Sequence, residues 1–241
     1  MKRDYLSVSA LKAFAKSPNH YIQYVTQKKP QSAAMAFGSA VHCAILEPKE
    51  WDRRYAVAPK VDRRTKAGKE AWKNFEELNA DKEVISMDDY ERIICVRDSV
   101  GRHGLSAQLL RQAEAVETRG ELEVFGYKFV GIADILGTGY VADLKTAQDA
   151  SPEQFSRSAQ NFGYHLQASL YRELWSVDNF YWIAVETQSP WNVAVYEQSD
   201  DAHEWATNKL IKLVDKFKAW DGKPQGYGDE LFTLDLPPWV K

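Results

Sequence analysis

The sequence predicts a fold of the α/β (α+β) class, in which a helix-rich first half leads into a mixed sheet covered by helices. Apolar residues recur at helical spacing as far as about residue 115, with prolines and glycines at the breaks. Between Val116 and Thr146 the pattern alternates with a period of two and is rich in β-branched and aromatic residues. Helical and strand patterns then follow in turn. We therefore expect a central sheet with an antiparallel meander, flanked by helices.

The length and composition fit one domain. A chain of 241 residues, 44% of them hydrophobic, can bury a substantial core, and its length fits one domain better than two. We predict a single domain over residues 1–241. Its parts are a helix-rich segment (1–115), a sheet with its helix (116–198), and a C-terminal helix with a tail (199–241).

The cysteine content and the charge exclude several classes of protein. Cys43 and Cys95 are too few for a disulfide framework, and an iron–sulfur cluster normally takes four thiolates. No N-terminal apolar run suggests a signal peptide or a membrane span, which predicts a cytoplasmic protein with no membrane partner. The net charge of −3 means that the chain as a whole does not attract nucleic acid electrostatically.

The helices of the first half are marked by their caps and breaks. Serines precede Leu11 and Phe14, whose spacing predicts a helix that Pro18 interrupts. A second helix is expected in "SAAMAFGSAVHCAILEP", and it ends at Pro48. Three more helical patterns lie between residues 66 and 115, separated by short polar or glycine-bearing breaks.

A basic segment lies between Arg53 and Lys73, in "RRYAVAPKVDRRTKAGKEAWK". Its eight basic residues are accompanied by only two acids, Asp62 and Glu70. Such a run is either a solvated charged surface or an arm that contacts phosphates. The residues expected to contact DNA in the second case are Arg63, Arg64, Lys66 and Lys69.

The second half begins with strands. In "GELEVFGYKFVGIADILGTGYVADLKT" the glycines at 126, 137 and 139 predict three strands joined by two hairpin turns. Ser151 and Pro152 then begin a helix that is expected to continue to Trp175. Two further strands are predicted in "NFYWIAVET" and "WNVAVYEQ". A last helix follows in 199–220, and the tail "FTLDLPPWVK" is expected to pack or to contact a partner.

The glycines of "GTGYVA" also fit the loose dinucleotide pattern G-x-G-x-x-A. A dinucleotide site needs a helix directly after the glycines, so that free N–H groups meet the pyrophosphate. Here the next residues form a strand pattern, and helix signals begin only at Ser151. A phosphate-binding P-loop is excluded because Gly68-Lys69 is followed by Glu70 and lacks the upstream glycine.

A hairpin turn has a consequence for the acids on either side of it. An even-length turn is expected to place Asp134 opposite Val141, on the same face as Asp143 and Lys145. Residues 130–136 and 140–146 would then pair, and the two carboxylates would be close enough to share a divalent cation. Glu121 would join that face as an additional acid if the turn at Gly126 also has an even length.

This combination of groups suits phosphodiester hydrolysis. Mg²⁺ prefers oxygen ligands, activates water and neutralises charge that builds on phosphorus. A neighbouring lysine can orient that water and screen the transition state. The alternative, an exposed charged face, fits poorly with so apolar a flanking sequence, because buried charges need a partner or a metal.

The pattern resembles the PD-(D/E)xK nuclease superfamily, with Asp134 as the first acid and Asp143-Leu144-Lys145 as the D-x-K element. Ala133 departs from the proline in the name of the motif. "FGSAVHCAILEP" is similar to the histidine-bearing helix of RecB-type members, and "YHLQASLYRE" to their Q-x-x-x-Y helix. Together with "LSVSALKAFAKSPNHY" and "VDRRTKAGKEAW", the order of motifs most resembles RecE-like (exonuclease VIII) nucleases and their phage relatives.

The resemblance implies a restriction-endonuclease-like core and a role for each matching residue. Mg²⁺, or Mn²⁺ in its place, would be held by Asp134, Asp143, the Leu144 carbonyl and His42. Lys145, Gln167 and Tyr171 would complete the catalytic group. The implied enzyme is an exonuclease that degrades one strand of linear double-stranded DNA from 5′ to 3′ and leaves 3′ overhangs for a RecT-type single-strand annealing protein. A ring of three or four copies in a bacterial cell, encoded by phage or host, is also implied.

Three other functions remain open at this point. A structure-specific endonuclease of the same fold would cut substrates without ends. A non-catalytic DNA-binding module would keep the fold but is disfavoured because Asp134, Asp143 and Lys145 are all present. A nicotinamide oxidoreductase is the most distant, since it would require a dinucleotide to bind.

Overall fold

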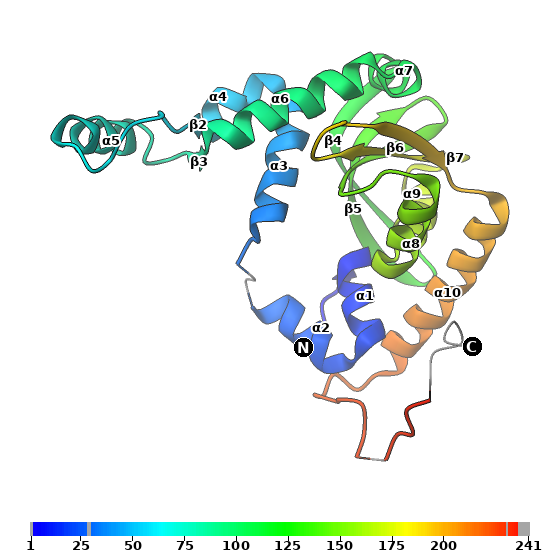
Figure 1. Ribbon diagram of the computed structural model, residues 1–241. Coiled ribbons are helices and arrows are strands. Elements are labelled where there is room, and N and C mark those ends of the chain that lie inside the picture. The colour runs from blue at the N-terminus through cyan, green and yellow to red at the C-terminus, as the bar shows by residue number, and fades with distance from the viewer. Residues whose placement is uncertain (1, 28–29, 230, 236–241) are drawn as a thin grey trace.

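A mixed sheet of six strands separates two layers of helices in the computed structural model, which describes residues 2–27, 30–229 and 231–235 (Figure 1). This arrangement agrees with the predicted fold class. The strands of this sheet are β1 (Tyr5–Leu6), β4 (Ala113–Val124), β5 (Tyr127–Gly137), β6 (Tyr140–Ala147), β7 (Asn179–Glu186) and β8 (Val193–Glu197).

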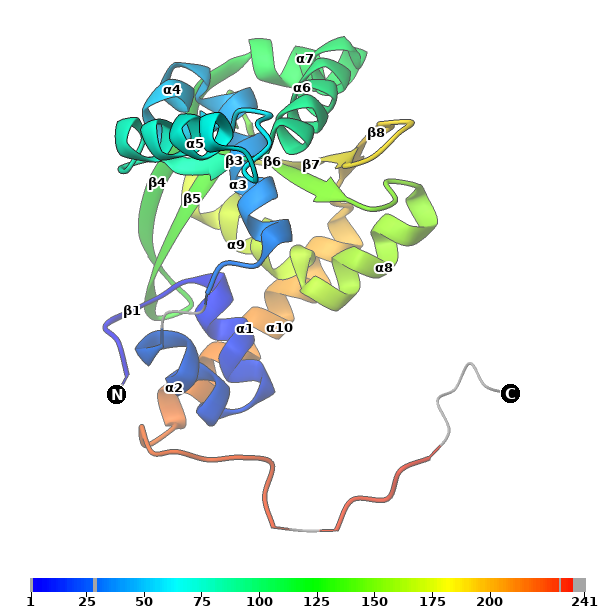
Figure 2. The same cartoon turned by 60° about the vertical axis from the view of Figure 1, so that its left-hand side comes forward.

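Each helical layer covers its own hydrophobic cluster on one side of the sheet (Figures 1 and 2). Within the described part of the chain, no helix is both long and apolar enough to cross a bilayer. The helices of the first layer are α1 (Val8–Lys16), α2 (Pro18–Thr26), α8 (Pro152–Phe162), α9 (Tyr164–Trp175) and α10 (Asp200–Ala219). Those of the second are α3 (Ala33–Leu46), the 3₁₀ turn η1 (Pro48–Glu50), α4 (Trp51–Arg54), α6 (Met87–Arg102) and α7 (Gly104–Arg111).

The predicted meander is confirmed, with both hairpin turns two residues long. Val124 pairs with Tyr127, and Gly137 pairs with Tyr140. Gly126 and Gly139 have φ values of 69° and 77°, a region that favours glycine and matches the twist of a two-residue hairpin. The pairing of β4 with β5 is antiparallel, as is that of β5 with β6.

The register of the second hairpin differs from the prediction. Val141 lies opposite Leu136 rather than Asp134, and the β5–β6 pairing stops at Ile135 and Ala142 instead of covering residues 130–136 and 140–146. The difference of two residues keeps the predicted faces, because side chains alternate with a period of two. Beyond Ala142, β6 continues as the parallel partner of β7, which the connection through α8 and α9 makes possible.

The early end of this pairing opens the sheet. Strand β4 pairs with β5 along its whole length, so β1 and β6 share the other edge of β5. There β1 pairs only with Lys128 and Phe129. Residues Val130–Asp134 of β5 therefore lack a strand partner on this edge. We call the opening between them and residues 143–147 of β6 the fork.

Two predicted boundaries are wrong. Strand β4 begins at Ala113 rather than Val116, so the helix-rich part ends earlier. The helix expected from Pro152 to Trp175 is two helices, because Gly163 takes the left-handed conformation (φ 63°, ψ 43°) and ends α8. In the tail, which was expected to pack or to contact a partner, Phe232 and Leu234 are 62% and 97% exposed, and residues 236–241 lie outside the described part.

The basic segment forms an arm that projects from the second layer (Figure 1). Two short parallel strands that the sequence did not reveal, β2 (Tyr55–Val57) and β3 (Glu83–Ile85), form its base. Helix α5 (Lys66–Leu78) lies at its far end, and among its residues only Gly68 is buried. We call residues 58–82 the arm.

Two paired glycines allow α9 to lie close to the sheet. Gly120 and Gly131 are opposite one another on β4 and β5. A Cβ on Gly131 would lie 2.7 Å from Tyr171 and 3.0 Å from Leu174, and one on Gly120 would lie 2.7 Å from Trp175. These distances are too short for real contacts, so α9 is held at a spacing that only glycine permits.

We expect Gly131→Ala to lower the free energy of unfolding by about 1–3 kcal/mol, because the added methyl group overpacks the contact with α9. Gly101→Ala is the matched control. A Cβ there meets nothing within 4 Å, and alanine in α6 should stabilise by up to about 1 kcal/mol. Urea unfolding of both variants measures the difference, and equal stabilities would contradict the proposed close packing.

Candidate active site

The fork turns the side chain of Asp134 towards β6. Asp134 is the first residue of β5 beyond the last pair with β6, and extending the register places it opposite Asp143. The Leu144 N–H donates a hydrogen bond of 2.8 Å to Asp134 Oδ2, so this carboxylate replaces the backbone acceptor that a continuous ladder would supply. The separation of the strands therefore brings the two predicted acids together.

Asp143 is held by groups from the first helical layer. Its side chain is only 2% exposed, and Gln167 Nε2 on α9 donates a hydrogen bond of 2.7 Å to its Oδ1. Lys145 Nζ lies 2.5 Å from Asp143 Oδ2 and 3.5 Å from Gln167 Oε1. The predicted residues Asp143, Lys145 and Gln167 thus form one connected group, in which Gln167 fixes the orientation of the carboxylate.

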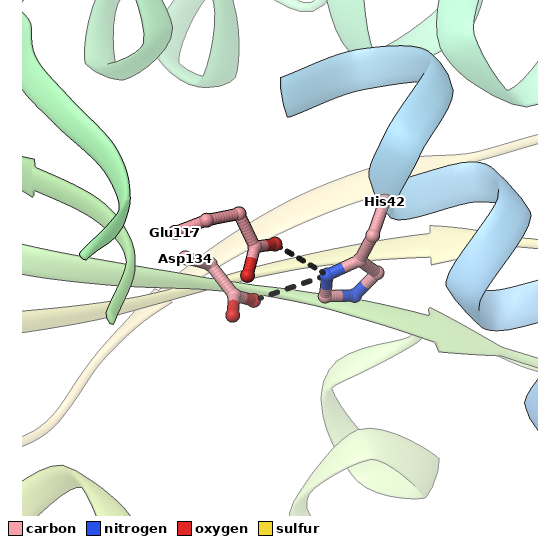
Figure 3. A group of neighbouring side chains, drawn as sticks. All are labelled: His42, Glu117 and Asp134. Atoms are coloured by element: carbon pink, nitrogen blue, oxygen red, sulfur yellow. Dashed lines mark ion pairs between the residues drawn. The ribbon is translucent and has the colours of Figure 1, made fainter. Parts of the chain in front are cut away.

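His42 reaches the same place from α3 in the second layer (Figure 3). Its Nε2 lies 2.8 Å from the Leu144 carbonyl oxygen, which can only accept, so this nitrogen carries a proton. Nδ1 therefore faces the carboxylates, 3.6 Å from Asp134 Oδ2 and 3.8 Å from Glu117 Oε1. When His42 is neutral, Nδ1 presents a lone pair to the space between the acids.

Glu117 is the residue that the sequence analysis missed. It lies between Val116 and Thr118, which pair with Ile135 and Ala133, and therefore stands opposite Asp134. The expectation for Glu121 is corrected, because that residue is four positions further along β4, about 13 Å away. Glu121 Oε1 instead accepts a 3.0 Å hydrogen bond from Lys128 Nζ. The signal in the sequence was the turn at Phe125-Gly126. If this turn is two residues long, Val124 pairs with Tyr127, and the same register places Glu117 opposite Asp134.

The group formed by His42, Glu117 and Asp134 has the donors that a divalent cation needs. One ligand atom from each lies within 4.8 Å of the others. Two carboxylates with an imidazole suit Mg²⁺ or Mn²⁺, which favour oxygen ligands. Asp143 and the Leu144 carbonyl, the other two predicted ligands, border the same fork, but their oxygens contact Lys145, Gln167 and His42.

The acid–base properties also indicate an excess of negative charge in the fork. Burial and the neighbouring Asp143 raise the pKa of Asp134 to about 7. Burial lowers the pKa of His42, but Glu117 and Asp134 outweigh it and the net direction is upward. Burial likewise opposes the charge of Lys145, and Asp143 and Asp134 outweigh it, so its pKa is raised. A bound cation would offset the repulsion from Asp143 that helps to raise the pKa of Asp134.

Tyr171 supports the open edge of β5. Its hydroxyl oxygen accepts a 3.3 Å hydrogen bond from the Ile132 N–H, inside the fork. Burial, with Asp143 next in effect, raises the pKa of Tyr171 to about 12, so it stays neutral. The tyrosine thus satisfies backbone that has no strand partner, which is a positioning role.

Two hollows open on either side of Lys145. One, of about 610 Å³, is lined by His42, Glu117, Lys145 and part of α3. The other, of about 470 Å³, is lined by Lys145, Gln167 and Tyr171 together with residues of α1. Lys145 therefore faces two spaces, one of which is also lined by His42 and Glu117.

The four predicted DNA contacts lie on the arm, which projects away from the sheet (Figure 1). The Arg63 guanidinium stacks on Trp72, 4.2 Å from the ring centroid, and Arg64 Nε lies 3.1 Å from Asp62 Oδ1. Lys66 and Lys69 are exposed on α5. None of the four lines either hollow beside Lys145.

Comparisons with known proteins agree with this fold. A crystal structure of a "Putative exonuclease" from Eubacterium rectale superposes with a TM-score of 0.65 at 14% identity, covering 89% of this chain and 80% of that one. A phage related exonuclease from Haemophilus somnus has 16% identity over 79% of this chain and 87% of its own. Its TM-score of 0.37 is too low to indicate a shared fold. The curated proteins contain no match.

The fold and the fork define a nuclease of the PD-(D/E)xK class. The model of one family within this class, the PDDEXK-like domain of unknown function (DUF3799), matches residues 7–224. The chain belongs to that family.

We expect Asp134→Asn to make the metal-free protein less sensitive to pH. An aspartate titrates near 3.9 in the unfolded chain, so a folded pKa of about 7 removes stability as the pH rises from about 4 to 7. Between about pH 4 and 7 the free energy of unfolding of the wild type should therefore fall by about 2–4 kcal/mol relative to that of the variant, and it should fall no further above pH 7. Urea unfolding in a chelator at several pH values measures this loss.

Glu121→Gln provides the control. Lys128 holds the pKa of Glu121 below its usual range, so this acid is ionised in both states above about pH 5. The free energy of unfolding of Glu121→Gln should differ from that of the wild type by the same amount at every pH between 5 and 8. A constant difference for Asp134→Asn as well would contradict the raised pKa of Asp134.

Proposed function

We propose that the protein is a Mg²⁺-dependent exodeoxyribonuclease that degrades one strand of linear double-stranded DNA, with Mn²⁺ as a possible substitute. The observation that carries this proposal is the convergence of His42, Glu117 and Asp134 beside the Asp143–Lys145 pair, in the fork of a PD-(D/E)xK fold. The description of the Eubacterium rectale protein, which shares the fold, supports an exonuclease over other nucleases.

The side chains of the fork divide the work of hydrolysis. Bound Mg²⁺ would supply an activated water and offset the charge that develops on phosphorus. Lys145 Nζ, which contacts Asp143 and Gln167, would orient the attacking water and screen the transferring phosphate. His42, fixed by the Leu144 carbonyl, keeps Nδ1 directed at the acids. Gln167 and Tyr171 act through other groups and are positioning residues.

The finer features of the proposal rest on the resemblance to RecE-like nucleases. These are digestion from 5′ to 3′, release of a 3′ overhang to a RecT-type annealing protein, and a homo-oligomeric ring of three or four copies. A bacterial cytoplasm, with a phage or host gene, belongs to the same proposal.

Glu117→Gln tests the acidic group directly. Loss of a carboxylate that holds the cation should lower the cleavage rate by about 100-fold or more, because several kcal/mol of transition-state stabilisation depend on it. Glu121→Gln, on the same strand, should keep the wild-type rate. The assay uses linear duplex labelled at the 5′ or the 3′ end, with Mg²⁺ or a chelator, and isothermal calorimetry measures metal binding.

The choice of DNA separates the proposal from its rivals. Degradation of linear but not covalently closed duplex, from the 5′ end, agrees with the proposed exonuclease. Cutting of the closed form would favour a structure-specific endonuclease of the same fold. No cleavage by the wild type with either metal would favour a non-catalytic DNA-binding module.

The arm generates a separate test of duplex binding. If Lys66 and Lys69 contact phosphates, Lys66→Ala combined with Lys69→Ala should lower the slope of log K against log salt by about 1.8, since each contact contributes about 0.9. Stability should change by no more than about 0.5 kcal/mol. We choose these lysines because Arg63 stacks on Trp72, and its loss would also alter the arm.

Binding is measured on an Asp143→Asn background to prevent cleavage, across a salt series. Lys212→Ala, an exposed lysine on α10 at the opposite side of the molecule from α5, is the control (Figure 1). An unchanged slope in the double variant would identify the basic segment as a solvated charged surface.

A further inference from the structure

A groove leads away from Lys145 along the first helical layer. The hollow of about 470 Å³ beside Lys145 continues into another of about 390 Å³, and the two share Ser9, Lys12 and Tyr24 in their linings. The groove is bounded by α1 and α2 on one side and by the junction of α8 and α9 on the other. We call these two connected hollows the α1–α8 groove. It starts at the catalytic lysine and opens to solvent.

The α1–α8 groove has one sign of charge. Among the described residues that line it there is no aspartate or glutamate. Such a lining is unusual for a chain with a net charge of −3, and it favours an anionic occupant. The basic residues in the groove are Lys12, Lys16, Arg119, Lys145 and Lys209.

Aromatic rings follow the same path as the cations. Lys145 Nζ lies 4.9 Å from the centroid of the Tyr164 ring, and Tyr164 stacks on Phe162 at 5.7 Å with an interplanar angle of 26°. Phe162 is 60% exposed and Tyr24 is 39% exposed, although both are large aromatic side chains. Gly163, in its left-handed conformation, ends α8 between the two stacked rings and so places them side by side.

Rings and cations in one groove match a single nucleic-acid strand better than a duplex. A single strand presents the flat faces of its bases, which stack on aromatic side chains, while its phosphates contact lysines. In a duplex the bases stack on one another, and only phosphates and base edges face outward. The exposed faces of Phe162 and Tyr24 would gain little from a duplex.

We propose that the α1–α8 groove binds single-stranded DNA and guides that strand to or from Lys145, with bases stacked on Phe162 and Tyr24 and phosphates on Lys12, Lys16 and Lys209. This inference deepens the proposed nuclease function and rests on it for the identity of the strand. The duplex is assigned to other surfaces, such as the arm, so the two DNA forms should respond to different substitutions.

The test measures binding without cleavage. The full-length protein in a chelator is titrated into a fluorescent oligothymidine of about 12 nucleotides, or into a duplex of the same length, and anisotropy is recorded across a salt series. Phe162→Ala should weaken binding of the single strand by about fivefold or more, because each stacked base contributes that much. Lys16→Ala combined with Lys209→Ala should lower the single-strand salt slope by about 1.4.

Matched controls come from outside the groove. Phe232→Ala removes another exposed ring, 62% exposed in the segment after α10, and Lys49→Ala removes an exposed lysine of η1. Neither residue lines the groove, so neither variant should change single-strand affinity. Duplex affinity should be the same in all variants, and urea unfolding verifies that each one folds.

The outcomes distinguish this inference from the proposed function. If the groove variants lose equal affinity for single strand and duplex, the groove is a general DNA surface and the inference is overturned. If neither groove variant loses affinity for the single strand, the inference is also overturned. If the protein cleaves duplex DNA but does not bind the oligothymidine, the inference about the groove is wrong and the proposed nuclease function still holds. Selective binding of the single strand by a protein that never cleaves would support the groove and contradict the nuclease.

Discussion

The rest of the site depends on the loss of strand pairing between β5 and β6 after Ile135 and Ala142. Backbone groups that leave a ladder must be satisfied by other partners. Here a carboxylate takes the Leu144 N–H, an imidazole contacts the Leu144 carbonyl, and a tyrosine hydroxyl takes the Ile132 N–H. The residues expected to act on DNA are thus also the ones that complete the hydrogen bonds of an interrupted sheet. Structure and chemistry share the same atoms.

This sharing explains why the site draws on both helical layers. A continuous sheet would separate α3 from α9, but the fork lets His42 and Gln167 approach the same pair of strands from opposite sides. Charge is concentrated there as a result. The ionised carboxylate of Asp134 is repelled by Asp143, and burial strengthens this repulsion. The interaction lowers the stability of the metal-free protein. His42, Glu117 and Asp134 could together hold a divalent cation, whose charge would offset this repulsion.

Periodicity was sufficient to predict the fold class, the three-stranded meander and the shared face of Asp143 and Lys145. Periodicity could not predict the register, because alternation shows only which face of the sheet a side chain occupies and not which residue lies opposite it. Glu117 and Glu121 are four residues apart on β4 and share a face, so alternation could not show which of them lies opposite Asp134. His42 and Gln167 came from the resemblance, since their contacts cross from one element to another. The fork itself was invisible in the sequence, as was the break at Gly163, where one glycine in a helical pattern is a weak signal.

The arm has a different relation to the fold. Only Gly68 of α5 is buried, and the arm joins the body through two strands of three residues each. Its helix is capped locally by the Thr65 side chain, which accepts from the Gly68 N–H. Substitutions at its surface therefore leave the sheet and its helices undisturbed. Because α5 has so few buried contacts with the body, the length and sequence of the arm can change without altering the packing of the sheet.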